Sequence, residues 1–196
     1  MENYNAIIKI TEKRNSLLNF TKEELIGWEE PIWGWTKLNV DGSVIQPGSK
    51  SACGGLIRDW TGRTIVGFSM NIEICTITMA ELWGIYVGVK LVSGLGIAKL
   101  VMESDSKCAM TLIQKMSTEI HGSSSLIRSI KELLVKMKSV EVRHIYRETN
   151  FCIDTLAKLG EEHKPRIKFW EQPLPCLFHH FFTGASNVKF SRVVVQ

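Results

Sequence analysis

The stretch WTKLNVDGSVIQPGSKSACGGLIRDWTGRTIVGFSMNI, residues 35–72, contains three largely apolar runs separated by glycine-rich turns. The first run alternates and stops at Asp41 and Gly42, the second follows the turn QPGSKSACGG, and the third follows the tight turn TGR. Short runs joined by glycine turns are typical of an antiparallel meander. We therefore predict three antiparallel strands, at about 35–42, 54–60 and 64–72.

A helical period replaces this alternation after residue 72. Apolar residues recur at helical spacing within MAELWGIYVGVKLVSGLG, residues 79–96, and two glycines end the pattern. The next run is almost wholly apolar at its centre, as in a strand that is covered on both faces. The remaining patterns predict strands at 97–105 and 140–146 and helices at 106–115, 126–137 and 150–162.

These elements predict one α/β domain. Strands linked through helices pair in parallel, so we expect a five-stranded mixed sheet of three antiparallel and two parallel strands, with helices on both faces. We place this domain at 35–163. Residues 1–34 are interpreted as an N-terminal leader or linker, with a possible short helix at about Thr21–Trp28 because Thr21 and Glu24 resemble a capping box. Residues 164–196 are interpreted as an irregular, basic and aromatic C-terminal tail.

Composition excludes several classes of protein. The chain of 196 residues is 44% hydrophobic and 22% charged, which indicates a globular protein. The net charge of +4 lies mostly in residues 164–196, so charge alone does not indicate a polyanionic partner for the domain. Five scattered cysteines without a CxxC pair argue against a disulfide framework.

Charges interrupt the first 20 residues, unlike a signal peptide, and we expect a soluble, intracellular monomer without membrane association.

Four carboxylates stand at comparable places in this pattern. Asp41 and Asp105 end the first and fourth strands, whereas Glu81 and Asp154 lie in the first turns of two helices. Each alone has a simpler explanation, as a turn residue, a cap or a favourable charge at a helix N-terminus. If the first and fourth strands are central neighbours, however, all four acids can meet at the sheet edge where open α/β sheets bind ligands.

Carboxylates that crowd together at one edge repel one another unless a cation is present. Hard oxygen ligands suit Mg²⁺ or Mn²⁺. Two such ions lying close together can activate water and stabilise the leaving oxygen in phosphodiester cleavage. We therefore predict a site for two divalent ions, with the ligands Asp41, Glu81, Asp105 and Asp154.

Five segments occur in the order and spacing of a known family. They read KLNVDGS, ACGGLIRDWTGRTIVGFS, AELWGI, VMESDS and HIYRETNFCIDTLAKLG. Together they resemble the type 1 ribonuclease H domain, and most closely the plant reverse-transcriptase-like branch that occurs in non-LTR retroelement polyproteins and as stand-alone proteins. The resemblance covers about residues 35–162. No segment is decisive alone, but all five in order are highly specific.

The resemblance implies a ribonuclease H-like fold and a function. It implies metal-dependent, endonucleolytic hydrolysis of the RNA strand of an RNA–DNA hybrid, which leaves a 3′-hydroxyl and a 5′-phosphate. The four metal-binding acids of the family fall on Asp41, Glu81, Asp105 and Asp154, and all four are present. The family's inserted basic helix is lacking, so hybrid binding should be weaker and strongly salt-dependent.

Two of the residues that precede Asp154 in the sequence, His144 and Arg147, are candidates for assisting catalysis. The family often carries a mobile histidine here that helps to protonate or release product, and His144 matches it by spacing. His144 is nevertheless predicted on a strand, whereas Arg147 lies in the loop and is better placed to reach a phosphate. We keep both candidates and prefer Arg147.

Recognition of RNA requires contact with the 2′-hydroxyl group, because this group distinguishes RNA from DNA. Gly42 has no side chain and could admit a nucleic-acid backbone closely. Ser43, Thr78 and Ser106 are polar residues beside the acids and are candidates for contacts with sugar hydroxyls or phosphates. A turn or cap role explains each of these three equally well.

Two other functions remain open. The chain could be a catalytically weak or inactive retroelement-derived protein that only binds nucleic acid. It could also be another nuclease of the same fold, such as an exonuclease or a transposase, because a fold does not determine a substrate. The three-strand meander followed by AEL favours ribonuclease H.

Overall fold

A computed structural model describes residues 21–45, 48–115, 123–162, 164, 166–172 and 190–195. The chain forms two compact units, one of residues 1–26 and 189–196 and the other of Gly27–Val188. Within the described residues of the smaller unit, strands β1 (Thr21–Ile26) and β8 (Phe190–Val195) pair antiparallel. The larger unit contains the mixed sheet and the helices.

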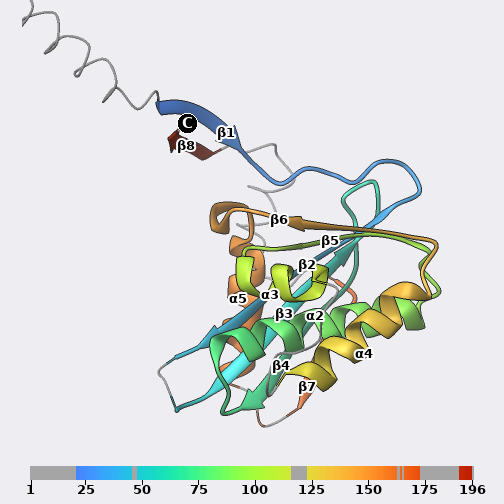
Figure 1. The fold of residues 1–196 in the computed structure, drawn as a ribbon, viewed down its shortest axis with the longest axis vertical. Helices are drawn as coiled ribbons and strands as arrows, with labels where there is room; N and C mark the ends of the chain where they lie inside the picture. Colours follow the sequence, from blue (N-terminus) through green and yellow to red (C-terminus); the bar gives the residue numbers. More distant parts are fainter. Residues whose placement is uncertain are drawn as a thin grey trace, which may run out of the picture. The chain divides into compact units, whose positions relative to one another are not determined.

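The mixed sheet has six strands in the order β6-β5-β2-β3-β4-β7 (Figure 1). The strands are β2 (Thr36–Val44), β3 (Ser51–Arg58), β4 (Thr64–Glu73), β5 (Lys99–Ser104), β6 (Ser139–His144) and β7 (Ile167–Trp170). Strands β2, β3 and β4 form an antiparallel meander and β7 pairs antiparallel with β4, whereas β5 pairs parallel with both β2 and β6. The carboxyl ends of β2 and β5 therefore lie side by side at the centre of the sheet.

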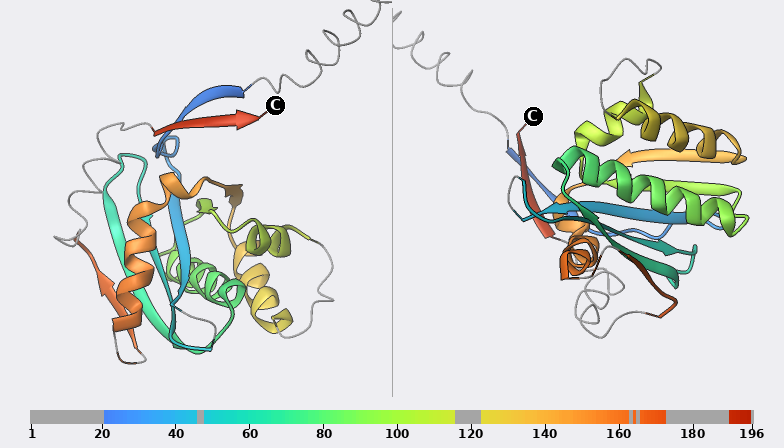
Figure 2. Two further views of the ribbon diagram at one scale, coloured as in Figure 1. Left: turned by 90° about the vertical axis from the view of Figure 1, so that its left-hand side faces the viewer. Right: turned by 90° about the horizontal axis from the view of Figure 1, so that it is seen from below.

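The helices cover both faces of the sheet, as Figure 2 shows. They are α2 (Ile77–Gly94), α3 (Lys107–Gln114), α4 (Ser124–Val135) and α5 (Phe151–Glu162), with a 3₁₀ turn η1 at Arg147–Thr149. Helix α2 packs on β2 and β3 and is flanked by α3 and α4, whereas α5 packs on β2, β3 and β4 from the opposite face.

Two apolar clusters fill the space on the two faces of the sheet. The larger joins α2 and α4 to the sheet, and its fully buried members include Leu38, Phe68, Ile85 and Ile130. The smaller lies under α5 and consists of Leu56, Ile153 and Leu156, with Trp170 packed against it. Alternate residues of one strand serve the two clusters, as the neighbours Leu56 and Ile57 show. The predicted α/β fold is thus confirmed, with the helices on both faces.

Two details of the prediction are wrong. The sheet has six strands rather than five, because β7 adds to the free edge of β4. Residues 21–26 form a strand rather than a helix, because they pair with β8 at the other end of the chain. Trp28 lies in the larger unit, half-buried against the sheet. The predicted domain limits, 35 and 163, remain predictions.

Within the residues that the structure describes, no helix is both long and apolar enough to cross a membrane.

Candidate metal centre

Three carboxylates meet at the carboxyl ends of the central parallel strands. Asp41 lies within β2, which continues to Val44 rather than ending at Asp41 as predicted, whereas Asp105 directly follows β5. Glu81 comes from α2, which begins at Ile77, so that Glu81 lies in the second helical turn rather than in the first as predicted. One carboxylate oxygen from each of Asp41, Glu81 and Asp105 lies within 4.8 Å of the other two.

The close approach of α2 to β2 brings Glu81 to this site. A Cβ atom on Gly42 would lie only 2.5 Å from the backbone nitrogen of Glu81 and 2.7 Å from the carbonyl carbon of Ala80. Glycine is therefore required at position 42 by helix packing. The backbone N–H of Gly42 also donates to Oδ1 of Asp41 at 3.0 Å, which orients that carboxylate.

Burial and mutual repulsion disfavour the charged forms of these acids. Burial, followed by the charges of Asp105 and Asp154, raises the pKa of Asp41 to about 8. Burial, followed by the charges of Asp41 and Asp105, raises the pKa of Glu81 to about 9. Without a cation, the site therefore holds protons at neutral pH, and a metal ion would replace them.

The donor set fits a hard divalent cation. Oε2 of Glu81 is buried and has no hydrogen-bond partner, although a buried carboxylate oxygen normally requires one. An oxygen cluster that is buried, repulsive and incompletely paired is the arrangement that Mg²⁺ or Mn²⁺ satisfies. Asp41, Glu81 and Asp105 are thus the residues able to hold an ion.

Asp154, the fourth predicted ligand, lies in the first turn of α5 as predicted, and two cationic side chains pair with it. Its Oδ2 accepts from Nζ of Lys158 at 2.5 Å, and its Oδ1 accepts from Nη2 of Arg147 at 3.3 Å. Asp154 does not belong to the group of three, although its charge contributes to the raised pKa of Asp41. Both of its oxygens are therefore neutralised by cations of the chain itself.

Asn150 is a site residue that sequence reasoning missed. It was not among the predicted site residues, but its Nδ2 donates to the carbonyl of Val40 at 3.0 Å and to Oδ1 of Asp105 at 3.2 Å. The side chain is 1% exposed, and it ties the start of α5 to β2 and to a carboxylate of the cluster. A single asparagine before a helix gives no sequence signal for such a role.

The two candidates for assisting catalysis lie on either side of this site. His144 is the last residue of β6, and its Nε2 lies 3.1 Å from the backbone carbonyl of Asp105. Because a carbonyl only accepts, this contact requires a proton on Nε2. Arg147 lies in η1, and its side chain is 75% exposed beyond its ion pair with Asp154. A guanidinium so exposed remains accessible to a phosphate.

Comparison with known proteins assigns the chain to a family. The sequence profile of the family described as reverse transcriptase-like matches residues 39–160, which include all four acids. The chain belongs to this reverse transcriptase-like family. The predicted resemblance to its plant branch agrees with a match to an Arabidopsis thaliana protein whose provisional name is ribonuclease H protein. That match is 37% identical over 154 residues and covers 78% of this chain but only 24% of the relative.

Solved structures show the same fold at low sequence identity. Ribonuclease H1 of Halobacterium salinarum superposes with a TM-score of 0.61 at 17% identity, over 65% of this chain and 98% of that protein. The ribonuclease H1 named LC11, solved with an RNA/DNA hybrid, gives a TM-score of 0.60 at 17% identity, over 65% and 96% of the two chains. The reverse transcriptase-like domain therefore has the ribonuclease H fold.

Three residues of this reverse transcriptase-like domain that were predicted to contact substrate interact with other residues of the chain. Oγ of Ser43 donates to Glu161 of α5 at 2.6 Å, and Oγ of Ser106 accepts from the Ala109 backbone as the N-cap of α3. The hydroxyl of Thr78 contacts Sγ of Cys108 at 4.0 Å. The cap interpretation of Ser106 is confirmed, and the substrate contacts of all four residues, Gly42 included, remain predictions.

Proposed function

We propose that this domain is a metal-dependent nuclease that hydrolyses the RNA strand of RNA–DNA hybrids. The observation that carries the proposal is the approach of Asp41, Glu81 and Asp105 to within 4.8 Å, at the carboxyl ends of paired parallel strands. The name of the Arabidopsis relative and the hybrid bound to ribonuclease H1 LC11 support this choice of substrate. The chain spans about a quarter of that relative, so its activity is a proposal that a test of this chain decides.

The chain's own residues would hold two divalent ions in this proposal. Asp41, Glu81 and Asp105 offer the buried oxygens, and Asp154 completes the set when its carboxylate turns from Lys158 toward the cluster. Bound Mg²⁺ or Mn²⁺ would supply an activated water and charge stabilisation at the leaving oxygen. Asn150 would hold the Asp105 carboxylate in place through its amide hydrogen bond.

Arg147 and His144 would act on the phosphate side of the reaction. The exposed guanidinium of Arg147 can donate two hydrogen bonds to a phosphate. When it does so, its ion pair with Asp154 breaks and the ion pair between Asp154 and Lys158 remains. His144 would carry a proton toward the leaving oxygen, provided that it leaves the carbonyl of Asp105. Thr78, in the first turn of α2, and Ser106, the N-cap of α3, would contact sugar or phosphate oxygens.

The test is cleavage of a hybrid whose RNA strand carries a 5′ label. With Mg²⁺ the unaltered chain should produce internal RNA fragments, and Asp41→Asn or Asp105→Asn should reduce the rate by at least about 10²-fold. Each substitution removes one negative oxygen ligand while keeping the size of the side chain. Circular dichroism should show that both variants retain the fold.

Three results would decide against this function. Undiminished cleavage by both variants would refute the assignment of the metal ligands. Hybrid binding without cleavage that Mg²⁺ stimulates would favour the catalytically inactive, nucleic-acid-binding alternative. Cleavage of single-stranded or duplex DNA in preference to the hybrid would favour another nuclease of the same fold.

A further inference from the structure

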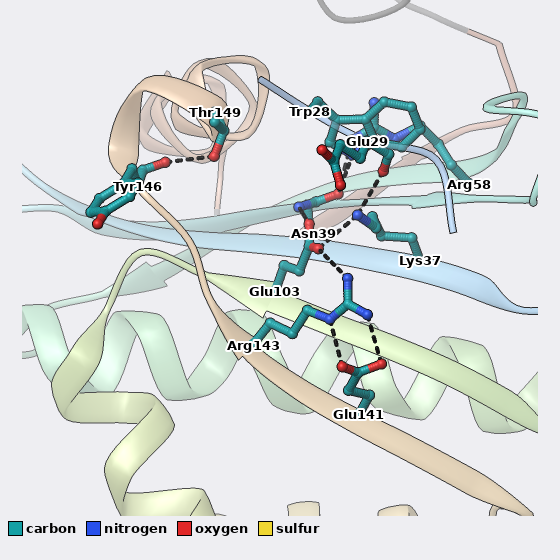
Figure 3. Close-up of polar contacts among 10 residues, drawn as sticks. All are labelled: Trp28, Glu29, Lys37, Asn39, Arg58, Glu103, Glu141, Arg143, Tyr146 and Thr149. Atoms are coloured by element: carbon teal, nitrogen blue, oxygen red, sulfur yellow. Dashed lines mark hydrogen bonds and ion pairs between the residues drawn. The ribbon is translucent and has the colours of Figure 1, made fainter. Parts of the chain in front are cut away.

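A buried network of charged and polar side chains connects β2, β3 and β5 (Figure 3). Oε2 of Glu103 accepts from Nδ2 of Asn39 at 2.8 Å, and Oε1 of Glu103 pairs with Nζ of Lys37 at 2.6 Å. Oδ1 of Asn39 accepts from Nη2 of Arg58 at 2.8 Å and from Nε1 of Trp28 at 3.2 Å. Every polar atom of the Asn39 amide group is thereby used.

The network is aligned with the metal ligands by strand register. Asn39 pairs with Glu103 across the parallel strands β2 and β5. Asp41 follows Asn39 by two residues within β2, so both side chains lie on the same side of that strand, and Asp105 follows Glu103 by two residues, directly after the end of β5. The Asn39–Glu103 hydrogen bond therefore spans the two strands immediately before both strands present a carboxylate.

Burial makes this hydrogen bond costly to alter. Asn39 is 0% exposed, Lys37 2% and Glu103 4%. A charge so deeply buried requires a partner, and Glu103 has one on each side, since Arg143 of β6 also approaches its Oε1 at 4.0 Å. One carboxylate thus connects β2, β5 and β6, and the network has little freedom to change its spacing.

We propose that Asn39 and Glu103 are positioning residues, whose hydrogen bond fixes the separation of Asp41 and Asp105 and thereby sets the affinity of the site for a divalent cation. This inference rests on the proposed metal-dependent function. Asn39 and Glu103 do not contact the ion. They act through the spacing of the two strands that carry the metal ligands. Substitution of residues that support metal ligands commonly lowers the metal affinity by about 10- to 100-fold.

The variant Asn39→Asp distinguishes the effect of strand spacing on cation affinity from the effect of an added charge. The substitution keeps the acceptor for Arg58 and Trp28 but replaces the donor to Glu103 with a repelling carboxylate. An added negative charge would by itself strengthen cation binding, whereas a disturbed spacing weakens it. We expect the affinity for Mn²⁺, measured by titration calorimetry at one pH, to fall by about tenfold or more.

A compensating variant and a control complete the experiment. In Asn39→Asp/Glu103→Gln the carboxylate and the amide exchange strands, so a hydrogen bond of reversed direction can form and the net charge returns to that of the unaltered chain. This double variant should recover most of the Mn²⁺ affinity. Ile130 is a buried residue of α4 in the larger apolar cluster. The control variant Ile130→Ala should lower the free energy of unfolding without changing the Mn²⁺ affinity. If Asn39→Asp does not fold, Asn39→Ala removes the same donor and should show the same loss.

The outcomes distinguish this inference from the function on which it rests. Folded Asn39→Asp and Asn39→Ala variants that bind Mn²⁺ as tightly as the unaltered chain would overturn the positioning role, as would a double variant that recovers nothing. An unaltered chain that binds no Mn²⁺, or an Asp41→Asn variant that binds it equally well, would instead overturn the metal site itself.

Discussion

Asp41 carries its carboxylate in a strand whose residues from Thr36 to Gly42 are all buried. The Gly42 N–H and the charge of Arg147 offset part of the cost. A turn residue would be exposed and stable when charged. The environment of Asp41 instead favours its neutral form until a cation arrives, which distinguishes a ligand from a turn residue at the level of one side chain.

The raised pKa of Asp41 predicts how pH affects the metal-free chain. The folded chain keeps a proton on Asp41 up to about pH 8, whereas the unfolded chain releases it near the ordinary value of 3.8. Because the folded state binds more protons between these values, the free energy of unfolding should fall as pH rises through this window. Urea unfolding in EDTA should show a flatter pH dependence for Asp41→Asn, and identical slopes for both chains would contradict the shift.

Gly42→Ala should destabilise the domain, because the added methyl group meets the backbone of α2 rather than a movable side chain. We expect a loss of about 1–3 kcal/mol in the free energy of unfolding. Gly94→Ala is the matched control, since nothing lies within 4 Å of its Cβ position near the end of the same helix. That variant should be neutral or gain up to about 1 kcal/mol. Equal effects of the two substitutions would rule out the close approach as the cause.

Carboxylates near the ends of predicted strands and near helix starts allowed the acidic cluster to be predicted, because period-2 alternation and a change to helical period locate the elements to within a few residues, although β2 continues three residues past Asp41. The roles of Asn150 and Asn39 could not be predicted in this way. Both depend on partners that are distant in sequence, since Glu103 lies 64 residues from Asn39, and Asp105 and Val40 lie 45 and 110 residues from Asn150. Gly42 was likewise predicted from the sequence only to admit a substrate backbone, and the packed structure adds a second reason for glycine there, the close approach of α2.

At the scale of elements, the two errors share one cause. The capping-box pattern at Thr21 is local, but the strand β1 exists through its pairing with β8 at the far end of the chain. Strand β7 has only four residues and no alternation long enough to read, and it forms because β4 offers a free edge. Long, periodic elements were predictable, and short elements that depend on a distant partner were not.

Strand β7 should contribute to stability through one face only. Trp170 is half-buried against the cluster under α5, whereas its neighbour Phe169 is 50% exposed. Trp170→Ala should therefore lower the free energy of unfolding by about 2 kcal/mol, and Phe169→Ala should change it by no more than about 0.5 kcal/mol. Denaturant unfolding of both variants provides the measurement, and a larger effect at Phe169 would contradict the orientation of the strand.

At the scale of the whole molecule, the larger unit begins at Gly27, ahead of the first strand of its sheet. Trp28 explains this limit, because its ring stacks 3.6 Å from the guanidinium carbon of Arg58 and its indole N–H donates to Asn39. The backbone carbonyl of Glu29 accepts from Nζ of Lys37 at 2.7 Å. A segment that reads as a linker thus supplies partners for buried charges.

Two truncations test this limit. A chain of residues 27–188 should unfold at nearly the same urea concentration as the full chain, since it retains the larger unit. A chain of residues 36–188 loses the stacking and the hydrogen bonds of Trp28 and Glu29, and it should be less stable by about 2–3 kcal/mol. Trp28→Ala in the full chain should reproduce much of this loss. Equal stability of the two truncated chains would show that the segment is dispensable.

The pairing of β1 with β8 has a consequence for protein engineering. Ile26 pairs with Phe190 and Thr21 with Val195, so the chain departs from and returns to neighbouring positions in an antiparallel ribbon. Segments that enter and leave side by side suit the insertion of a domain into a surface loop of a host protein, because the host needs only a small gap.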